Sequence, residues 1–160
     1  VVWRPEQAPL VQAILGPLMD DGAMYERALA GAQAEIAADA RDKFAWFNAG
    51  TNLLALGRGA EAADAYDSAI ALKLPWRMMW YQFGPYQAYF DQNRHEDVVK
   101  LASATLKRVR NLEESLYWRG RSNAALGNIQ SARGDLAQAI QYNPNYADAR
   151  AALDSLNKAG

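Results

Sequence analysis

The chain has 160 residues, of which 51% are hydrophobic, and its formal net charge at pH 7 is -1. This length and composition are sufficient for one continuous hydrophobic core. A net charge so close to zero argues against a general nucleic-acid binder or a protein that binds membrane surfaces. The sequence contains no cysteine, which excludes a disulfide framework, a thiolate metal site and a cysteine nucleophile within it. No apolar run approaches the roughly 18 residues that a membrane-spanning helix needs.

The segment before Asp42 lacks a clear repeat. Two β-branched residues and a proline open the chain, so we expect residues 1–8 to be a linker or the end of an upstream domain. Residues 9–41 predict a degenerate helical pair, with a short helix over 9–18 and a longer one from Ala23 to Asp39.

Three clearer helical pairs are predicted over 42–74, 75–111 and 112–145. Small residues recur in the first and third pairs. Gly50 and Gly57 of the first pair are separated by the same number of residues as Gly120 and Gly127 of the third pair. Each of Gly57 and Gly127 allows a tight turn between two helices. Residues 146–160 predict an amphipathic capping helix, which a repeat array needs to cover its last apolar face.

A period of about 34 residues with these landmarks resembles the tetratricopeptide pattern of paired antiparallel helices. The resemblance implies an all-α fold, namely an α-solenoid of helix-turn-helix repeats that form a right-handed superhelix. In this architecture the paired helices cross closely, so one position on each helix must be small. We assign these positions to Gly50 and Gly120 on the first helices and to Ala62 and Ala132 on the second helices.

The middle pair departs from the pattern. Its turn at Asn93-Arg94 lies slightly further from Gly57 than from Gly127, which indicates an insertion of about two residues relative to the usual repeat length. We predict a first helix over residues 75–92. Pro85 falls inside this helix, where it removes a backbone donor and bends the helix.

The inner surface formed by the first helices of the pairs is the expected binding groove. Helical spacing from the landmarks aligns Phe47, Tyr81 and Tyr117. One turn further on it aligns Thr51, Pro85 and Arg121. Aromatic side chains are typical anchors for bound peptides. The candidate ligand-binding residues are Phe47, Thr51, Tyr81, Gln82, Tyr89, Tyr117, Trp118 and Arg121.

The residues give no support to an active site. His95 is the single histidine, and a packing or surface role fits it better than catalysis or metal binding. No nucleotide-binding loop is present, so we expect no enzyme activity, no catalytic residue, no metal and no cofactor. Chaperone-binding members of the tetratricopeptide family use a carboxylate clamp. Phe47 and Thr51 occupy the corresponding positions here, so we expect no binding of chaperone tails.

A second resemblance covers nearly the whole chain. The stretches that carry it are Trp3-Arg4-Pro5-Glu6-Gln7, Ile14-Leu15-Gly16, Ala23-Met24-Tyr25, Ala45-Trp46-Phe47-Asn48, residues 74–84 and Asn111-Leu112-Glu113-Glu114-Ser115. In these stretches the chain is similar to the C-terminal repeats of certain bacterial proteins in which a papain-like cysteine peptidase domain of the double-glycine, bacteriocin-processing type comes first. The resemblance implies a bacterial parent protein, exported or attached to the cell surface, whose catalytic residues lie upstream.

The sequence therefore predicts a non-catalytic, monomeric scaffold that binds a protein or a peptide in its groove. One alternative is an accessory module of a cysteine peptidase-like protein, which orients the catalytic domain or presents its substrate and contacts an upstream domain of the same polypeptide. Another is a structural spacer without a ligand. The partner, the affinity and the compartment do not follow from the sequence.

Overall fold

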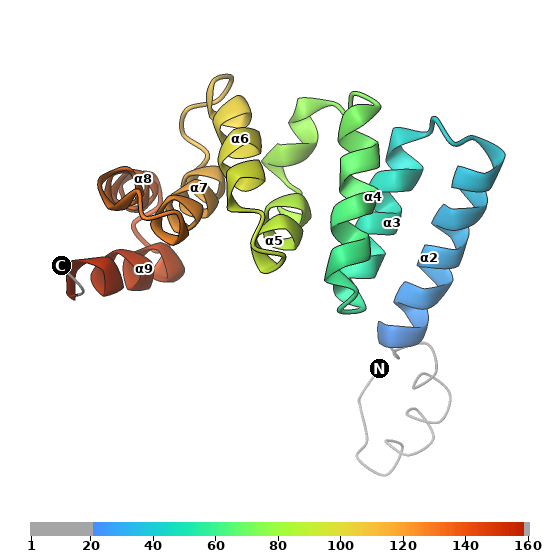
Figure 1. Cartoon of the computed structure of the whole chain (residues 1–160), viewed down its shortest axis with the longest axis horizontal. Coiled ribbons are helices and arrows are strands. Elements are labelled where there is room, and N and C mark those ends of the chain that lie inside the picture. Colours follow the sequence, from blue (N-terminus) through green and yellow to red (C-terminus); the bar gives the residue numbers. More distant parts are fainter. Residues whose placement is uncertain (1–20, 159–160) are drawn as a thin grey trace, which may run out of the picture. The chain divides into compact units, whose positions relative to one another are not determined.

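The computed structural model describes residues 21–158 of the chain (Figure 1). The expected linker over 1–8 and the short helix over 9–18 lie outside the described residues. Within 21–158 every regular element is helical, with eight α-helices and one 3-10 helix. The chain divides into two compact units, Val1–Lys73 and Leu74–Gly160, and each unit is described by itself.

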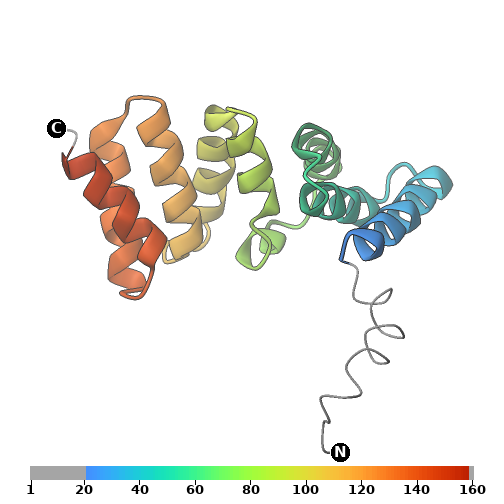
Figure 2. The same cartoon turned by 90° about the horizontal axis from the view of Figure 1, so that it is seen from below.

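The first unit contains α2 (Asp21–Ala38), α3 (Lys43–Ala55) and α4 (Gly59–Ala71). α3 begins after Asp42, whose carboxylate accepts hydrogen bonds from the backbone N–H groups of Phe44 and Ala45 and so satisfies two amides that have no partner within the helix. α3 packs against both α2 and α4. It is therefore the central helix of the unit (Figures 1 and 2).

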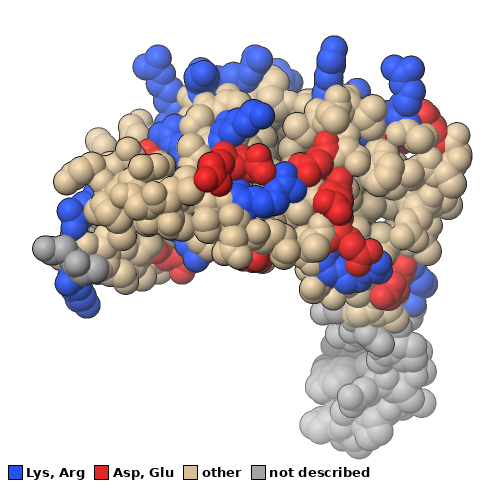
Figure 3. Space-filling model, viewed as in Figure 1, with Lys and Arg blue, Asp and Glu red and all other residues tan. Residues whose placement is uncertain are grey.

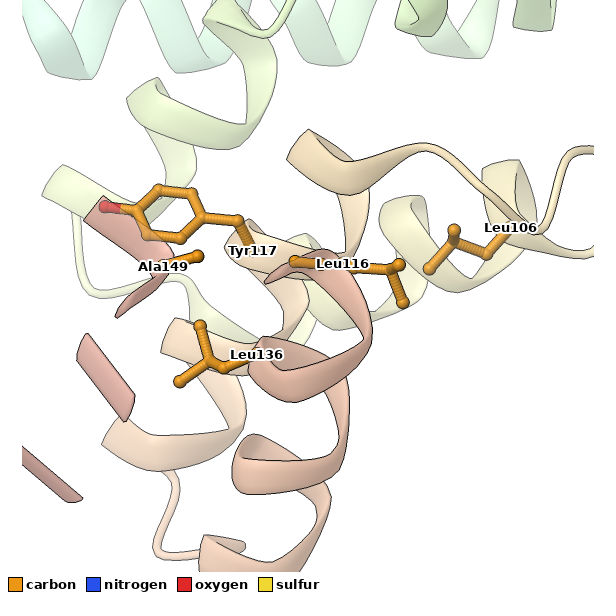
Figure 4. Packing of buried hydrophobic residues seen from close by; sticks show 6 residues of the cluster. Leu106, Leu116, Tyr117, Leu136 and Ala149 are labelled. Atoms are coloured by element: carbon orange, nitrogen blue, oxygen red, sulfur yellow. The ribbon is translucent and has the colours of Figure 1, made fainter. Parts of the chain in front are cut away.

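The second unit contains the 3-10 helix η3 (Trp76–Trp80) and five α-helices. The α-helices are α5 (Gly84–Asp91), α6 (His95–Leu106), α7 (Glu113–Ala125), α8 (Ile129–Tyr142) and α9 (Ala147–Lys158). Each of them packs against the next one along the chain. Figure 4 shows the apolar core where α7, α8 and α9 meet, formed by Leu106, Leu116, Tyr117, Leu136, Ala139 and Ala149.

The single helix that we predicted over residues 75–92 is wrong. A 3-10 helix ends at Trp80 and α5 begins only at Gly84, so residues 81–83 separate two short helices. Pro85 does not bend a helix, because it lies in the first turn of α5. There a missing N–H is harmless, since the first amides of a helix have no intrahelical acceptor.

The predicted close crossing at the glycines is confirmed. A Cβ atom on Gly50 would lie 2.8 Å from the ring of Tyr66, and one on Gly120 would lie 2.9 Å from Cγ of Leu136. Ala62 and Ala132 are both fully buried on the opposing helices. The helices of these two pairs therefore approach closely enough to require glycine on the first helix.

The middle pair reverses the sizes of the two crossing residues. Gly57, Asn93 and Gly127 have φ angles of 74°, 57° and 79°, and they mark the same turn in the three pairs. Seven residues before the turn stand Gly50, Tyr86 and Gly120; nine residues after it stand Tyr66, Ala102 and Leu136. Tyr86 and Ala102 are both fully buried, so the large residue is on the first helix and the small one on the second.

Tyr86 also joins three helices through its hydroxyl group. The Tyr86 hydroxyl lies 3.1 Å from Oγ1 of Thr105 on α6 and 3.1 Å from Oγ of Ser115 on α7. All three side chains are buried, and a buried polar atom without a partner is costly. These hydrogen bonds therefore fix α5 to the following pair at the position where glycine stands in the other two pairs.

Candidate peptide-binding surface

One side of α7 carries an arginine surrounded by aromatic rings. Glu114, Tyr117, Trp118 and Arg121 share this side because they are spaced three or four residues apart along the helix. The guanidinium carbon of Arg121 lies 4.2 Å from the ring centre of Phe90, 5.4 Å from that of Trp118 and 5.5 Å from that of Tyr117. At these distances each ring face attracts the cation.

The rings around Arg121 also contact one another. Phe90 comes from α5, and its ring centre lies 5.6 Å from that of Trp118 on α7. Tyr117 lies between Trp118, at 5.4 Å, and Tyr146, at 5.0 Å. We call Phe90, Glu114, Tyr117, Trp118, Arg121 and Tyr146 the Arg121 cluster. The pairs Phe90–Trp118 and Tyr117–Trp118 pack edge to face and the pair Tyr117–Tyr146 is tilted. These geometries are favourable for aromatic rings, so the rings form one packed group beside Arg121.

Arg121 has no acidic partner among residues 21–158. Nη1 of Arg121 donates a hydrogen bond to the Tyr117 hydroxyl over 3.3 Å, and the ion pairs of the described residues involve other arginines. A guanidinium group has five N–H donors. Several donors therefore remain for a carboxylate from outside the chain.

Glu114 and Tyr146 form the other end of the cluster. Burial raises the pKa of the half-buried Glu114 carboxyl, and the charge of neighbouring Glu113 adds to the increase. Burial is also the main cause that raises the pKa of Tyr146, and the negative charge of Glu114 contributes. The cluster thus presents a cation at one end and a carboxyl group at the other, about two helical turns apart.

Two of the residues that we predicted for the groove lie in the first unit. Phe47 is only 3% exposed, and its ring centre lies 5.2 Å from that of Tyr66. Thr51 is exposed, and its Oγ1 donates to the Phe47 carbonyl oxygen over 3.1 Å. Phe47 is therefore a core residue of its own unit, whereas Thr51 is open to solvent.

The structure does not join the three predicted residues of the middle pair to the Arg121 cluster. Tyr81 is 73% exposed and its ring lies 6.0 Å from that of Trp80; Gln82 is also exposed. Tyr89 is only 2% exposed, and the guanidinium carbon of Arg94 lies 4.4 Å from its ring centre. Tyr89 therefore packs inside the unit.

The position of the two inserted residues explains this difference. The prediction counted forward from Gly50, but α5 keeps its register with the turn at Asn93, so the insertion precedes α5. Counted back from that turn, Phe83 takes the position of Tyr117, and the exposed Gln87 takes that of Arg121.

Three members of the cluster were not among the predicted groove residues. They are Phe90, Glu114 and Tyr146, of which Tyr146 was predicted only as the start of the capping helix. His95 packs edge-on against Phe90, with ring centres 4.8 Å apart, and its Nδ1 atom is buried without a hydrogen-bond partner. Phe90 could have been predicted by counting the register of α5 back from the turn at Asn93, because Phe90 lies three residues before that turn.

Residues 21–158 contain neither a metal-binding cluster nor a membrane-spanning helix. No group of three or more histidine, cysteine or acidic side chains in this part of the chain could hold a metal ion. No helix in the same range is sufficiently long and apolar to span a bilayer.

Solved structures resemble the whole described chain. A MamA fragment from Desulfovibrio magneticus RS-1 superposes with a TM-score of 0.77 at 16% identity, over 96% of this chain and 85% of that one. YrrB, described as a TPR protein with an unusual peptide-binding site, gives 0.75 at 17% identity, over 95% and 73%.

A third structure is the first TPR of Spaghetti (RPAP3) bound to the HSP90 peptide SRMEEVD. It gives a TM-score of 0.65 at 19% identity, over 76% of this chain and 94% of that one. No family model matches the sequence, and no curated protein matches it. Similarity at these identities establishes the fold. The chain therefore has the helical solenoid fold of tetratricopeptide repeat proteins, as the repeat pattern predicts.

Proposed function

We propose that this chain is a non-catalytic scaffold for protein interaction and that the Arg121 cluster binds a peptide segment with an acidic side chain or a terminal carboxylate. The observation that carries the proposal is the guanidinium group of Arg121, held against three rings and without an ionic partner among the described residues. A guanidinium fixed in this way loses little entropy when it binds a carboxylate through two hydrogen bonds.

The similar structures support the class of ligand. RPAP3 is named with a bound HSP90 peptide and YrrB with a peptide-binding site, and a tetratricopeptide surface therefore binds peptides in at least two proteins of this fold. In this chain Phe47 and Thr51 stand at the first clamp positions. SRMEEVD also contains no aromatic side chain. We therefore expect this peptide to bind weakly here, and the preferred ligand to combine a carboxylate for Arg121 with an aromatic side chain for the rings.

The experiment is a titration followed by 1H–15N NMR. The probe is a dodecapeptide of Glu, Asp and Phe, and its control is the same peptide with Gln and Asn in place of the acids. The acidic peptide should shift the Trp118 indole N–H signal and the amide signals of α7. Arg121→Gln should weaken its binding about tenfold or more, whereas the matched Lys100→Gln, which removes an exposed cation of α6, should not.

Equal binding of both peptides would refute the carboxylate as the recognised group. Equal effects of Arg121→Gln and Lys100→Gln would show that only net charge matters, and would remove the cluster as the site. Circular dichroism of both variants excludes misfolding as the cause of lost binding.

The peptidase-accessory alternative stays a prediction from sequence resemblance. None of the similar structures named above is described as a peptidase, and no contact within residues 21–158 favours it over the scaffold.

A further inference from the structure

A second surface, in the first unit, has the opposite charge. α2 and α4 flank α3, and the space between them forms a groove of about 460 Å³ whose floor is α3. We call this surface the acidic groove. It is lined by Leu29, Gln33 and Ile36 of α2, by Trp46, Ala49 and Leu53 of α3, and by Glu61, Asp64, Ala65 and Ser68 of α4.

The floor of the acidic groove is apolar. Leu29, Ala49 and Leu53 are buried, while Ile36 and Trp46 are partly exposed. The indole N–H of Trp46 donates to the Ala40 carbonyl oxygen over 3.0 Å, so the polar atom of this ring has its partner within the chain. The groove therefore offers carbon surface at its base, and an occupant must bring apolar side chains.

The α4 side of the groove is acidic. Figure 3 shows a row of acidic side chains on the surface where α4 lies. Glu61 is paired with Arg58 over 2.6 Å, but the carboxylate of Asp64 has no ion-pair partner among residues 21–158. Between residues 21 and 73 there are eight acidic and five basic side chains. A charge of this sign next to an apolar floor selects an occupant with lysine or arginine beside its apolar residues.

The walls also select the conformation of the occupant. Both are α-helices, whose backbone groups are already hydrogen-bonded within the helix, so they offer no free edge to an extended strand. An occupant that lies in the apolar groove must satisfy its own backbone, as a helix does. α4 has 13 residues and is about 20 Å long, which accommodates about three to four turns of a partner helix.

We propose that the acidic groove binds an amphipathic helix of a partner protein whose apolar stripe is flanked by lysine and arginine. This inference goes beyond the function of the Arg121 cluster, because it concerns another unit, other helices and a ligand of opposite charge. It does not depend on that function being correct.

The test uses the full chain and two designed helical peptides of about four turns each. Both carry leucine at i, i+3, i+4 and i+7; one has lysine on the flanks and the other has glutamate. 1H–15N NMR should show that the lysine peptide shifts the Trp46 indole N–H signal and the amides of Ala49 and Ala65, while the glutamate peptide does not. Asp64→Asn should weaken binding of the lysine peptide several-fold, and Ile36→Asn should weaken it further.

The matched control is Asp154→Asn, which removes one exposed carboxylate from α9 of the second unit and should leave the affinity unchanged. Shifts confined to the Arg121 cluster, or equal effects of Asp64→Asn and Asp154→Asn, would overturn the proposal. Two further outcomes would also overturn it, because each identifies another occupant. These are Trp46 signals that move with protein concentration alone, which indicate a second copy, and nuclear Overhauser contacts of Trp46 with residues 1–20 in the free chain.

Discussion

The close approach of α7 and α8 predicts opposite effects for the same substitution at two glycines. A Cβ atom added to Gly134 of α8 would have no atom within 4 Å, whereas one added to Gly120 would lie 2.9 Å from Cγ of Leu136 and 3.2 Å from Cβ of Asp135. In an exposed helix, alanine is more favourable than glycine by about 1 kcal/mol. Gly134→Ala should therefore raise the free energy of unfolding by about 0.5–1 kcal/mol.

At Gly120 the same gain is opposed by overpacking, which costs about 1–3 kcal/mol in a filled core. Cγ of Leu136 cannot move alone, because this side chain is fully buried. Gly120→Ala should therefore be less stable than Gly134→Ala by about 1–3 kcal/mol. Gly31, which is equally open, and Gly50, which faces the Tyr66 ring, supply a second pair in the first unit.

The assay is urea unfolding followed by circular dichroism, with the free energy of unfolding compared between the paired variants. If Gly120→Ala stabilises the chain as much as Gly134→Ala does, then α7 and α8 separate without cost. Close helix approach would then not be the reason for glycine at this position.

Three further predictions concern single side chains. Tyr86→Phe should lower the free energy of unfolding by about 1–2 kcal/mol, because Thr105 and Ser115 lose a buried partner; a loss below about 0.3 kcal/mol in urea unfolding would contradict this. Burial raises the pKa of Glu114 in the folded state above its value in the unfolded state. The folded chain therefore binds the Glu114 proton more tightly, and the free energy of unfolding falls as the pH rises from the unfolded-state pKa to the folded-state pKa. Glu114→Gln should thus raise the melting temperature at pH 7 but not at pH 3, and an equal change at both would refute the effect of burial. Lys73 has a φ angle of 61°, so Lys73→Gly should raise the free energy of unfolding by about 1 kcal/mol, and a loss of stability would show that its side chain matters more than its backbone.

The two regular helical pairs were predictable because their signals are local. Gly57 and Gly127 both adopt positive φ angles and mark the turns directly in the sequence. Gly50 and Gly120 follow from the same spacing, and the structure places a large side chain against each of them. In these pairs each landmark depends only on residues of its own pair, so one sequence is sufficient to find it.

The middle pair was predicted less well because its packing is not local. The two inserted residues could stand anywhere between the turns at Gly57 and Asn93, and only the packed helix shows that they precede α5. Tyr86 breaks the small-residue rule for the first helix, while the position on the following helix that holds Tyr66 and Leu136 in the other two pairs holds the small residue Ala102. A landmark search that tests each position alone does not find such a compensated exchange.

The residues of the candidate site were also predicted where the sequence signal is local and missed where it is not. Tyr117, Trp118 and Arg121 were predictable as a group because helical periodicity places them on one side of α7. Phe90 was missed because its contact with Arg121 joins two helices and depends on the register of α5, which was misjudged. We predicted Phe47 in the groove because helical spacing aligns it with Tyr117. Its ring instead packs against that of Tyr66, and the position of Phe47 in the repeat does not predict this contact.

The opposite charges of the two surfaces decide how they can be told apart in solution. The described residues of the second unit include eleven basic and eight acidic side chains, whereas those of the first unit include more acidic than basic ones. Added salt would weaken binding to either surface, because it screens attraction of both signs. The sign of the peptide does distinguish them, since an acidic peptide is repelled by Asp64 and a basic one by Arg121. A titration with both peptides therefore tests the two surfaces independently, and the Trp46 and Trp118 indole signals report which one is occupied.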